Sequence, residues 1–191
     1  MDPRVVGDPQ VRRTDRSVHW CGPRIPDYPS SVPRITLSTV VPAPPVEVFA
    51  ICLDVDMHTQ SMGTTEHAIA GVTQGRLRLG DQVTWRARHL GVTWRMTVQI
   101  TDYESPHRFV DEQVSGPFHH WRHEHTFTPD PSAPARTMMH DIIDFDAPGG
   151  MAGTIGATVI LRPYLHRMVK RRNGFLSERL RRRPQQRDRW S

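Results

Sequence analysis

The stretch from residue 64 to residue 146 alternates apolar and polar residues with a period of two, and this pattern constrains the fold more than any other feature of the sequence. Such alternation is typical of strands in a sheet that buries one face. It is clearest in VTWRARH (83–89) and VTWRMTVQI (92–100), which flank Gly91 and predict an antiparallel pair. Shorter segments with the same period predict further strands at 35–41, 66–73, 107–114, 119–127 and 136–145.

Two other segments have helical spacing. Pro44 and Pro45 suit a first helical turn, and the apolar residues after them predict a short helix behind the first strand. After Pro148, apolar residues recur at helical spacing as far as Leu180 and predict a long C-terminal helix. The order of strand, short helix, about six strands and long helix predicts one α+β domain, in which a curved antiparallel sheet wraps around the C-terminal helix.

The ends of the chain differ from this domain in composition. Residues 1–33 contain six prolines, scattered charge and no apolar periodicity, so we expect an extended or disordered leader. The folded domain is expected from residue 34 to residue 183, followed by a basic tail at 184–191.

The sequence favours a cytoplasmic location. No apolar run approaches the roughly 20 residues that cross a bilayer, and residues 1–16 lack the apolar segment of a signal peptide. The two cysteines, Cys21 and Cys52, have no CxxC spacing and form no disulfide framework, which suits a reducing compartment.

The net charge of +5 is concentrated near the C-terminus, where residues 162–189 hold eleven Lys or Arg against two acidic residues. A basic segment can attract nucleic acid or an anionic surface. Because these residues also have helical spacing, we expect their charges to form the solvated face of a helix. Binding of nucleic acid or an anionic surface through this helix is therefore the less favoured alternative.

Four segments, covering about residues 35–183, resemble a known superfamily: PPVEVFAICLDVDMH, GDQVTWRARHLG, SPHRFVDEQVSGPFHHWRHEHTF and TMMHDIIDFDAPGG. The chain resembles the SRPBCC (START-like, helix-grip) superfamily, which includes the birch pollen allergen and polyketide cyclases, and within it a bacterial ligand-binding or cyclase/dehydrase-like branch. The resemblance implies a helix-grip fold with a deep, largely apolar cavity between the sheet and the C-terminal helix. It implies no single reaction, because the fold hosts carriers, cyclases and sensors.

The segment FHHWRHEHTF (118–127) holds four of the chain's eleven histidines. On a strand, His123 and His125 share a face with Trp121 and Phe127, so we expect both histidines to point towards the cavity. Three interpretations stay open: a metal site, a catalytic or ligand-orienting His–Asp pair, and histidines that are hydrogen-bonded within the sheet. A metal site needs at least a third ligand. The sequence does not fix that ligand, so we predict no metal and no cofactor.

The His–Asp pair depends on the register of segment 136–145 against segment 118–127. If Phe127 faces Thr137, then Asp141 faces His123, where it can fix the tautomer of the imidazole and raise its basicity. A buried His123–Asp141 pair would suit proton transfer in an aldol cyclisation or a dehydration. A slip of one residue places His140 opposite His125 instead and removes the pair.

The same alternation predicts which further side chains meet a ligand in the cavity: Trp85, His89, Trp94, Met96, Asp111, Gln113, Trp121, His125 and Met139. Tryptophans on inward faces suit an aromatic or polycyclic molecule. An inward Asp111 would need a partner, because burying a lone carboxylate is costly.

The sequence thus predicts a protein that binds a small hydrophobic or aromatic molecule. The alternative is a cofactor-free enzyme, similar to polyketide cyclases or dehydratases, in which His123 and Asp141 are catalytic.

Overall fold

The protein is built on one antiparallel sheet of seven strands, seen in a computed structural model that describes residues 33–149 and 156–187. The order of the strands across the sheet is β1-β7-β6-β5-β4-β3-β2, so consecutive strands from β2 to β7 are neighbours and β1 lies beside β7. The strands are β1 (Arg34–Val41), β2 (Glu66–Gly71), β3 (Gln82–His89), β4 (Val92–Glu104), β5 (Arg108–Ser115), β6 (His120–Asp130) and β7 (Ala133–Asp146). Residues 1–32, which are most of the leader expected at 1–33, lie outside the described part, as do residues 150–155 and 188–191.

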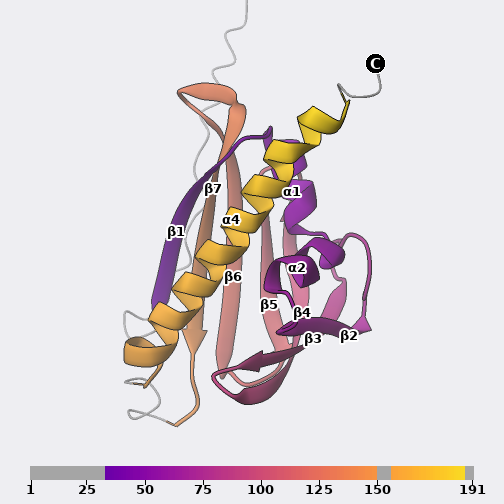
Figure 1. Cartoon of the computed structure of the whole chain (residues 1–191). Helices are drawn as coiled ribbons and strands as arrows, with labels where there is room; N and C mark the ends of the chain where they lie inside the picture. Colours follow the sequence, from indigo (N-terminus) through magenta and orange to yellow (C-terminus); the bar gives the residue numbers. More distant parts are fainter. Residues whose placement is uncertain (1–32, 150–155, 188–191) are drawn as a thin grey trace, which may run out of the picture.

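The long C-terminal helix crosses the sheet diagonally (Figure 1). A short π-helical segment, η1 (Ala157–Leu161), leads into α4 (Arg162–Arg187), which contacts β1 and α2. Two short helices, α1 (Pro45–Cys52) and α2 (Val55–Met62), connect β1 to β2. The fold-class prediction, an α+β helix-grip fold, is confirmed.

The short helices begin where the sequence provides suitable first residues. Pro45 occupies the first turn of α1, where its missing N–H costs no intrahelical hydrogen bond. The Asp54 carboxylate caps α2 by accepting a hydrogen bond of 3.0 Å from the backbone N–H of Met57. These two helices carry Cys52 and His58 to the side of the sheet that α4 covers.

Strands β3 and β4 are joined by a tight turn at Leu90 and Gly91, which both have positive φ angles of 51° and 80°. Two successive positive φ values match the twist of a two-residue hairpin. The register that follows pairs Trp85 with Met96 and Ala87 with Trp94, as the predicted alternation requires.

The pairing of β6 with β7 differs by two residues from the predicted register. Phe127 faces Met139, and Asp141 faces His125 rather than His123. A shift of two residues leaves each side chain on the same face of the sheet. Asp141 therefore still lies on the same face of the sheet as His123 and His125. Alternation had already placed these two histidines together.

The prediction was wrong because the hairpin is tighter than the PDPSAPA segment suggested. Pairing continues through Pro129, the register shifts between Pro129 and Asp130, and Asp130 faces Ala133. Residues 134–136 of β7 therefore lie between the partners of two adjacent β6 residues, and this irregularity moves the pairing that follows.

The apolar core lies between the sheet and the helices. One group of buried side chains surrounds Phe49, Phe109 and Phe127, whose rings meet edge-to-face or stacked at centroid distances of 5.6–5.8 Å. A second group joins Trp121 and Phe145 to Leu165 and Val169 of α4. None of the described helices contains a stretch that is long and apolar enough to cross a membrane.

Candidate functional site

A pocket of about 270 Å³ lies between the sheet and α4. Its walls come from β2, β3, β4, β5, β6 and the three α-helices, and most of the lining side chains are apolar, among them Leu77, Val83, Trp85, Val98, Phe109 and Leu165. A largely apolar enclosure with a few polar side chains is typical of small-molecule sites.

Most of the residues that the sequence predicted for the site line this pocket: Trp85, His89, Trp94, Met96, Asp111, Trp121, His123 and His125. Gln113, Met139 and Asp141 do not. The Gln113 amide donates a 2.7 Å hydrogen bond to the carbonyl of Phe118 and thereby holds the β5–β6 connection. Met139 is fully buried in the core, 3.6 Å from the Cys52 sulfur. Alternation identifies the inner face of a strand, but not the part of that face that other side chains cover.

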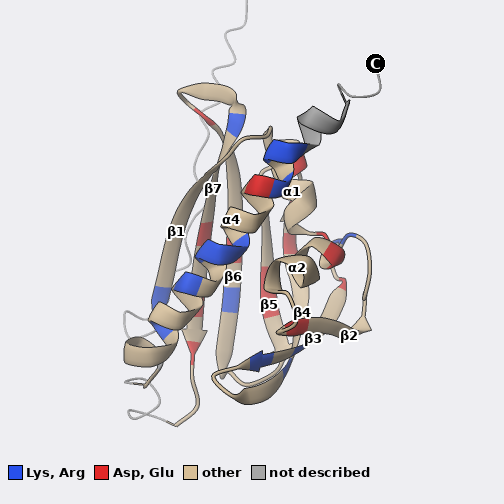
Figure 2. Cartoon of the chain, viewed as in Figure 1, with Lys and Arg blue, Asp and Glu red and all other residues tan. Residues whose placement is uncertain are grey.

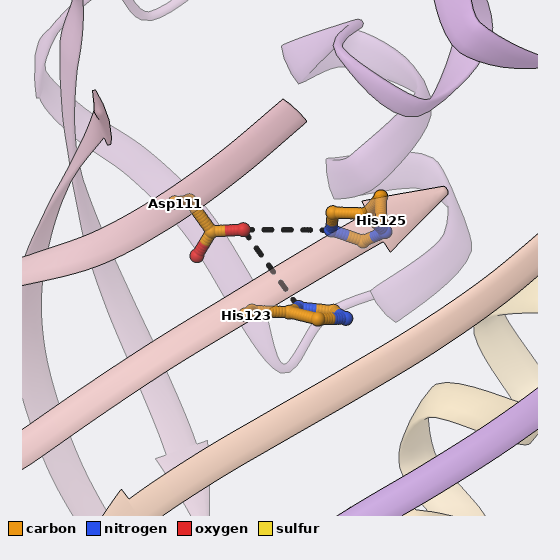
Figure 3. A group of neighbouring side chains, drawn as sticks. All are labelled: Asp111, His123 and His125. Carbon is orange, nitrogen blue, oxygen red and sulfur yellow. Dashed lines mark ion pairs between the residues drawn. The ribbon is translucent and has the colours of Figure 1, made fainter. Parts of the chain in front are cut away.

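At the pocket wall lies the central cluster, which we define as Asp111, His123 and His125, which line the pocket, and Asp141 and Asn173 behind them. Asp111 on β5 faces His123 on β6, and His125 faces Asp141 on β7. Asp111 Oδ2 lies 3.7 Å from His123 Nδ1 and 3.4 Å from His125 Nε2 (Figure 3). The three strands thus bring two imidazoles and two carboxylates together on one face.

Asp141 contacts the opposite nitrogens of both imidazole rings. Its Oδ1 lies 3.2 Å from His123 Nε2 and 2.8 Å from His125 Nδ1. The second contact is an ion pair without well-aligned hydrogen-bond geometry. The Asn173 amide of α4 donates to Asp141 Oδ2 at 2.7 Å and to Thr39 Oγ1 at 3.2 Å. Asp141 has no exposed surface, so these contacts replace water as partners of its charge.

These contacts shift the protonation of the two histidines in opposite directions. Burial and the charge of His125 lower the pKa of His123, although Asp111 and Asp141 act to raise it. Burial also acts to lower the pKa of His125, but its contacts with Asp111 and Asp141 prevail and raise it. His125 is therefore the ring that is favoured as an imidazolium, and His123 is favoured as neutral.

Both carboxylates of the central cluster remain ionised. Burial acts to raise the pKa of Asp141, but its contacts with His123 and His125 outweigh this and hold the pKa well below its usual range. For Asp111, burial is likewise outweighed by His125 and His123, and the pKa is lowered.

A second polar group lines the pocket further towards the edge of the sheet, and we call it the edge cluster: His58, Glu66, His89 and Tyr164. The two oxygens of Glu66 contact different histidines, His58 Nε2 and His89 Nε2, each at 2.7 Å. His89 Nδ1 lies 2.8 Å from the Tyr164 hydroxyl of α4. Burial acts to raise the pKa of Glu66, but the two histidines lower it to about 2. The carboxylate is thus charged, and each of its two oxygens has a histidine partner.

The sequence pattern predicted His89 in the pocket but not His58, Glu66 or Tyr164. Glu66 begins β2 and pairs with Ala87 of β3, so alternation continued from β3 would have placed it on the pocket face. No such signal exists for His58 or Tyr164, because their positions depend on how α2 and α4 pack on the sheet. His58 packs against Trp85, with ring centroids 4.2 Å apart.

Cys52 also lines the pocket, but burial raises the pKa of its thiol to about 12. A thiol that stays protonated at neutral pH is a poor nucleophile. The site therefore offers imidazole and carboxylate chemistry rather than thiolate chemistry.

The arginines of α4 are partly committed to contacts within the fold. Figure 2 shows Lys and Arg at intervals along α4, with acidic and other residues between them. Arg181 and Arg182 both pair with Glu178, at 3.2 and 2.7 Å, and buried Arg172 donates to the Cys52 carbonyl at 3.2 Å. These contacts reduce the charge that α4 can offer to a polyanion.

A sheet that closes on a long C-terminal helix around a pocket defines a helix-grip protein. The chain belongs to the family described as polyketide cyclase/dehydrase and lipid transport, which matches residues 32–181. This confirms the resemblance drawn from the sequence.

Solved structures show the same fold at low sequence identity. An aromatase/cyclase, Zhui from Streptomyces sp. R1128, is 16% identical with a TM-score of 0.63, and the match covers 80% of this chain and 95% of that one. A START superfamily protein from Mycobacterium smegmatis is 14% identical with a TM-score of 0.59, covering 77% and 98%. The protein TTHA0849 from Thermus thermophilus is 14% identical with a TM-score of 0.60, covering 75% and 97%. None of the curated proteins matches the sequence.

Proposed function

We propose that the protein binds a small hydrophobic or aromatic molecule in the pocket between the sheet and α4, in the cytoplasm. The observation that carries this proposal is the composition of the pocket, in which apolar walls contain two separate polar clusters. Its volume of about 270 Å³ lies just below the range of about 300–1,000 Å³ for ligand sites, which favours a compact molecule. Trp85 and Trp121 supply flat surfaces for an aromatic ring.

A substitution that fills the pocket tests this proposal. Ala87 is buried in β3 and lines the pocket, so Ala87→Leu adds volume there. Binding of 1-anilinonaphthalene-8-sulfonate, followed by its fluorescence, is expected to weaken about tenfold, since overpacking costs roughly 1–3 kcal/mol. Ala70→Leu is the matched control, because Ala70 is exposed on β2. Equal binding by the two variants would show that the dye binds elsewhere and would contradict the proposal.

The alternative function is a cofactor-free cyclase or dehydratase in which His123 transfers a proton. The observation that favours it is that His123 lines the pocket while its Nε2 lies 3.2 Å from the buried carboxylate of Asp141. A carboxylate in this position orients an imidazole so that its other nitrogen can accept a proton from a bound carbonyl compound.

Proton exchange separates an enzyme from a carrier without knowledge of the natural substrate. Acetophenone is a suitable probe because it is aromatic and its methyl protons exchange slowly with deuterated water. A general base in the pocket should accelerate the exchange, followed by NMR, by about 10²–10⁴-fold, and His123→Ala should abolish the acceleration. His120→Ala should have no effect, since His120 belongs to the opposite face of β6. No acceleration by the wild-type protein would favour the carrier.

A further inference from the structure

The central cluster brings three potential metal ligands to one point of the pocket wall. The ligand atoms of Asp111, His123 and His125 all lie within 4.8 Å of one another. Figure 3 shows the Asp111 carboxylate directed between the two imidazoles. No other group of three His, Cys, Asp or Glu side chains in the described part of the chain meets this criterion. We propose that Asp111, His123 and His125 bind one divalent first-row transition-metal ion.

The distances from Asp111 to the two histidines are close to those that a small ion requires. Bonds of about 2.0–2.2 Å from a tetrahedral ion to nitrogen and oxygen place two ligand atoms about 3.3–3.6 Å apart. Asp111 Oδ2 lies 3.4 Å from His125 Nε2 and 3.7 Å from His123 Nδ1. Both distances lie within a few tenths of an ångström of this range, and the ligand atoms of His123 and His125 lie within 4.8 Å of each other.

The outer contacts of the histidines orient the correct nitrogens towards the ion. The far nitrogens, His123 Nε2 and His125 Nδ1, both face Asp141 Oδ1. When these nitrogens carry the hydrogens, the near nitrogens present lone pairs to the same space as Asp111 Oδ2. In the metal-free protein a proton on His125 Nε2 can satisfy Asp111 Oδ2 at 3.4 Å, and a bound cation would take the place of that proton. A carboxylate behind a metal-binding histidine is the usual outer partner in protein metal sites.

The backbone holds the three ligands in position. His123 and His125 are two residues apart on β6, and Asp111 is paired directly with His123 across the β5–β6 ladder. The Trp121 indole N–H lies 3.4 Å from Asp111 Oδ1, the oxygen that does not face the histidines. The Asn173 amide holds Asp141 from the side of α4. No ligand depends on a flexible loop.

The donor set decides which ions suit the site. Two imidazoles and one carboxylate favour zinc or ferrous iron over magnesium or calcium, which prefer oxygen ligands. All three residues line the pocket, so the remaining coordination positions open towards it. A metal there would offer a bound molecule an electrophilic contact at the polar part of an otherwise apolar pocket.

The sequence led us to expect no metal because no third ligand could be placed. Asp111 was expected on an inner face, but its partner strand and register were not known. In the structure, Asp111 is paired with His123 across the β5–β6 ladder. Asp111 lies near Nδ1 of the His123 ring, whereas Asp141 lies near Nε2 on the opposite side of that ring.

Metal titration of the untagged full-length protein, stripped with a chelator, tests the proposal. Isothermal titration calorimetry with Zn²⁺ should show one site per chain, and Co²⁺ should produce visible absorption bands of a low-coordinate ion. Asp111→Asn, which preserves the shape of the side chain, should weaken Zn²⁺ binding by at least about 100-fold, because one of three ligands loses its charge. His125→Gln should have a similar effect.

Two matched controls remove other histidines. His120→Ala changes the same strand on its opposite face, and His58→Ala changes the edge cluster, and both should retain wild-type affinity for Zn²⁺. Circular dichroism of each variant establishes that it is folded. The proposal is overturned if wild-type protein shows no stoichiometric site, or if folded Asp111→Asn binds Zn²⁺ as well as the wild type.

The result is separable from the proposed binding of an apolar molecule. If the dye binds to metal-free protein and Ala87→Leu weakens it while Zn²⁺ does not bind, the binding function stands and the metal site fails. If Zn²⁺ binds with one site and the dye does not respond to Ala87→Leu, the metal site stands and the pocket proposal fails.

Discussion

The central and edge clusters use the same types of side chain in the same pocket, but they connect them differently. In the edge cluster, one carboxylate lies between two histidines, and each of its oxygens has one partner at 2.7 Å. In the central cluster, two histidines lie between two carboxylates, and ligand atoms of three residues converge. The edge cluster is therefore closed, because each charged oxygen is already matched. In the central cluster, the converging atoms of Asp111, His123 and His125 can still bind a proton or a cation.

The largest effect is expected from Asp141, which serves three partners without any contact with water. Asp141→Ala would leave His123, His125 and the Asn173 amide without their shared acceptor. Breaking a buried ionic network of this kind costs about 3–5 kcal/mol in the free energy of unfolding. Urea denaturation measures it. His140→Ala, on the neighbouring residue and the outer face, is the control and should cost less than about 1 kcal/mol. Similar losses for both variants would contradict the central role of Asp141.

An intermediate, pH-dependent effect is expected from the edge cluster. The pKa of Glu66 is about 2 in the folded protein, whereas the ordinary value of a glutamate is 4.5. Because the folded value is the lower one, the ionised carboxylate stabilises the fold above pH 4.5, and this contribution is lost as the pH falls towards about 2. The difference of about 2.5 units corresponds to roughly 3 kcal/mol.

Glu66→Gln removes this titration while preserving the size of the side chain. The difference in unfolding free energy between wild type and variant should be roughly 3 kcal/mol at neutral pH and should shrink steadily below pH 4.5. Urea denaturation at a series of pH values provides the measurement. A difference that does not change with pH would mean that the ionised form of Glu66 contributes nothing to stability.

The smallest effect is expected at the outer end of the edge cluster. Tyr164→Phe removes only the hydroxyl that lies 2.8 Å from His89 Nδ1. Since Tyr164 is only partly buried, water can replace the lost partner, and the cost should be about 1 kcal/mol or less. Thermal unfolding is sensitive enough to detect it. A loss as large as that of Glu66→Gln would show that Tyr164 is an integral part of the buried network.

The two clusters also differ in how far the sequence predicts them. Alternation along β6 placed His123 and His125 on one inner face, and the register assumed for β7 placed Asp141 with them. The exact pairs were wrong by two residues, because a register shift at Pro129 and Asp130 leaves no signal in a period of two. The face of the sheet on which a side chain lies follows from the local alternation of the sequence. The register between two strands follows from the geometry of the turn that joins them.

The edge cluster was largely hidden from the sequence for a different reason. His58 and Tyr164 lie on α2 and α4, and helix periodicity does not state which strand a helical residue will meet. Asp111 shows an intermediate case: its inner face followed from Phe109 two residues earlier, but its place opposite His123 needed the β5–β6 pairing. Contacts within one strand were predictable, and contacts between elements required the packed structure.

The amide of Asn173 restricts how α4 can pack on the sheet. Both of its hydrogen bonds, to Thr39 on β1 and to Asp141 on β7, come from one side-chain nitrogen that projects from the helix towards the sheet. Apolar packing alone tolerates sliding or turning of a helix, because one aliphatic contact can replace another at little cost. A rotation of α4 by a single residue position, about 100°, would carry this amide away from both acceptors and leave a buried carboxylate short of a partner. Asn173 therefore fixes both the rotation of α4 about its own axis and its position along that axis, whereas the apolar surfaces alone would accept many such arrangements.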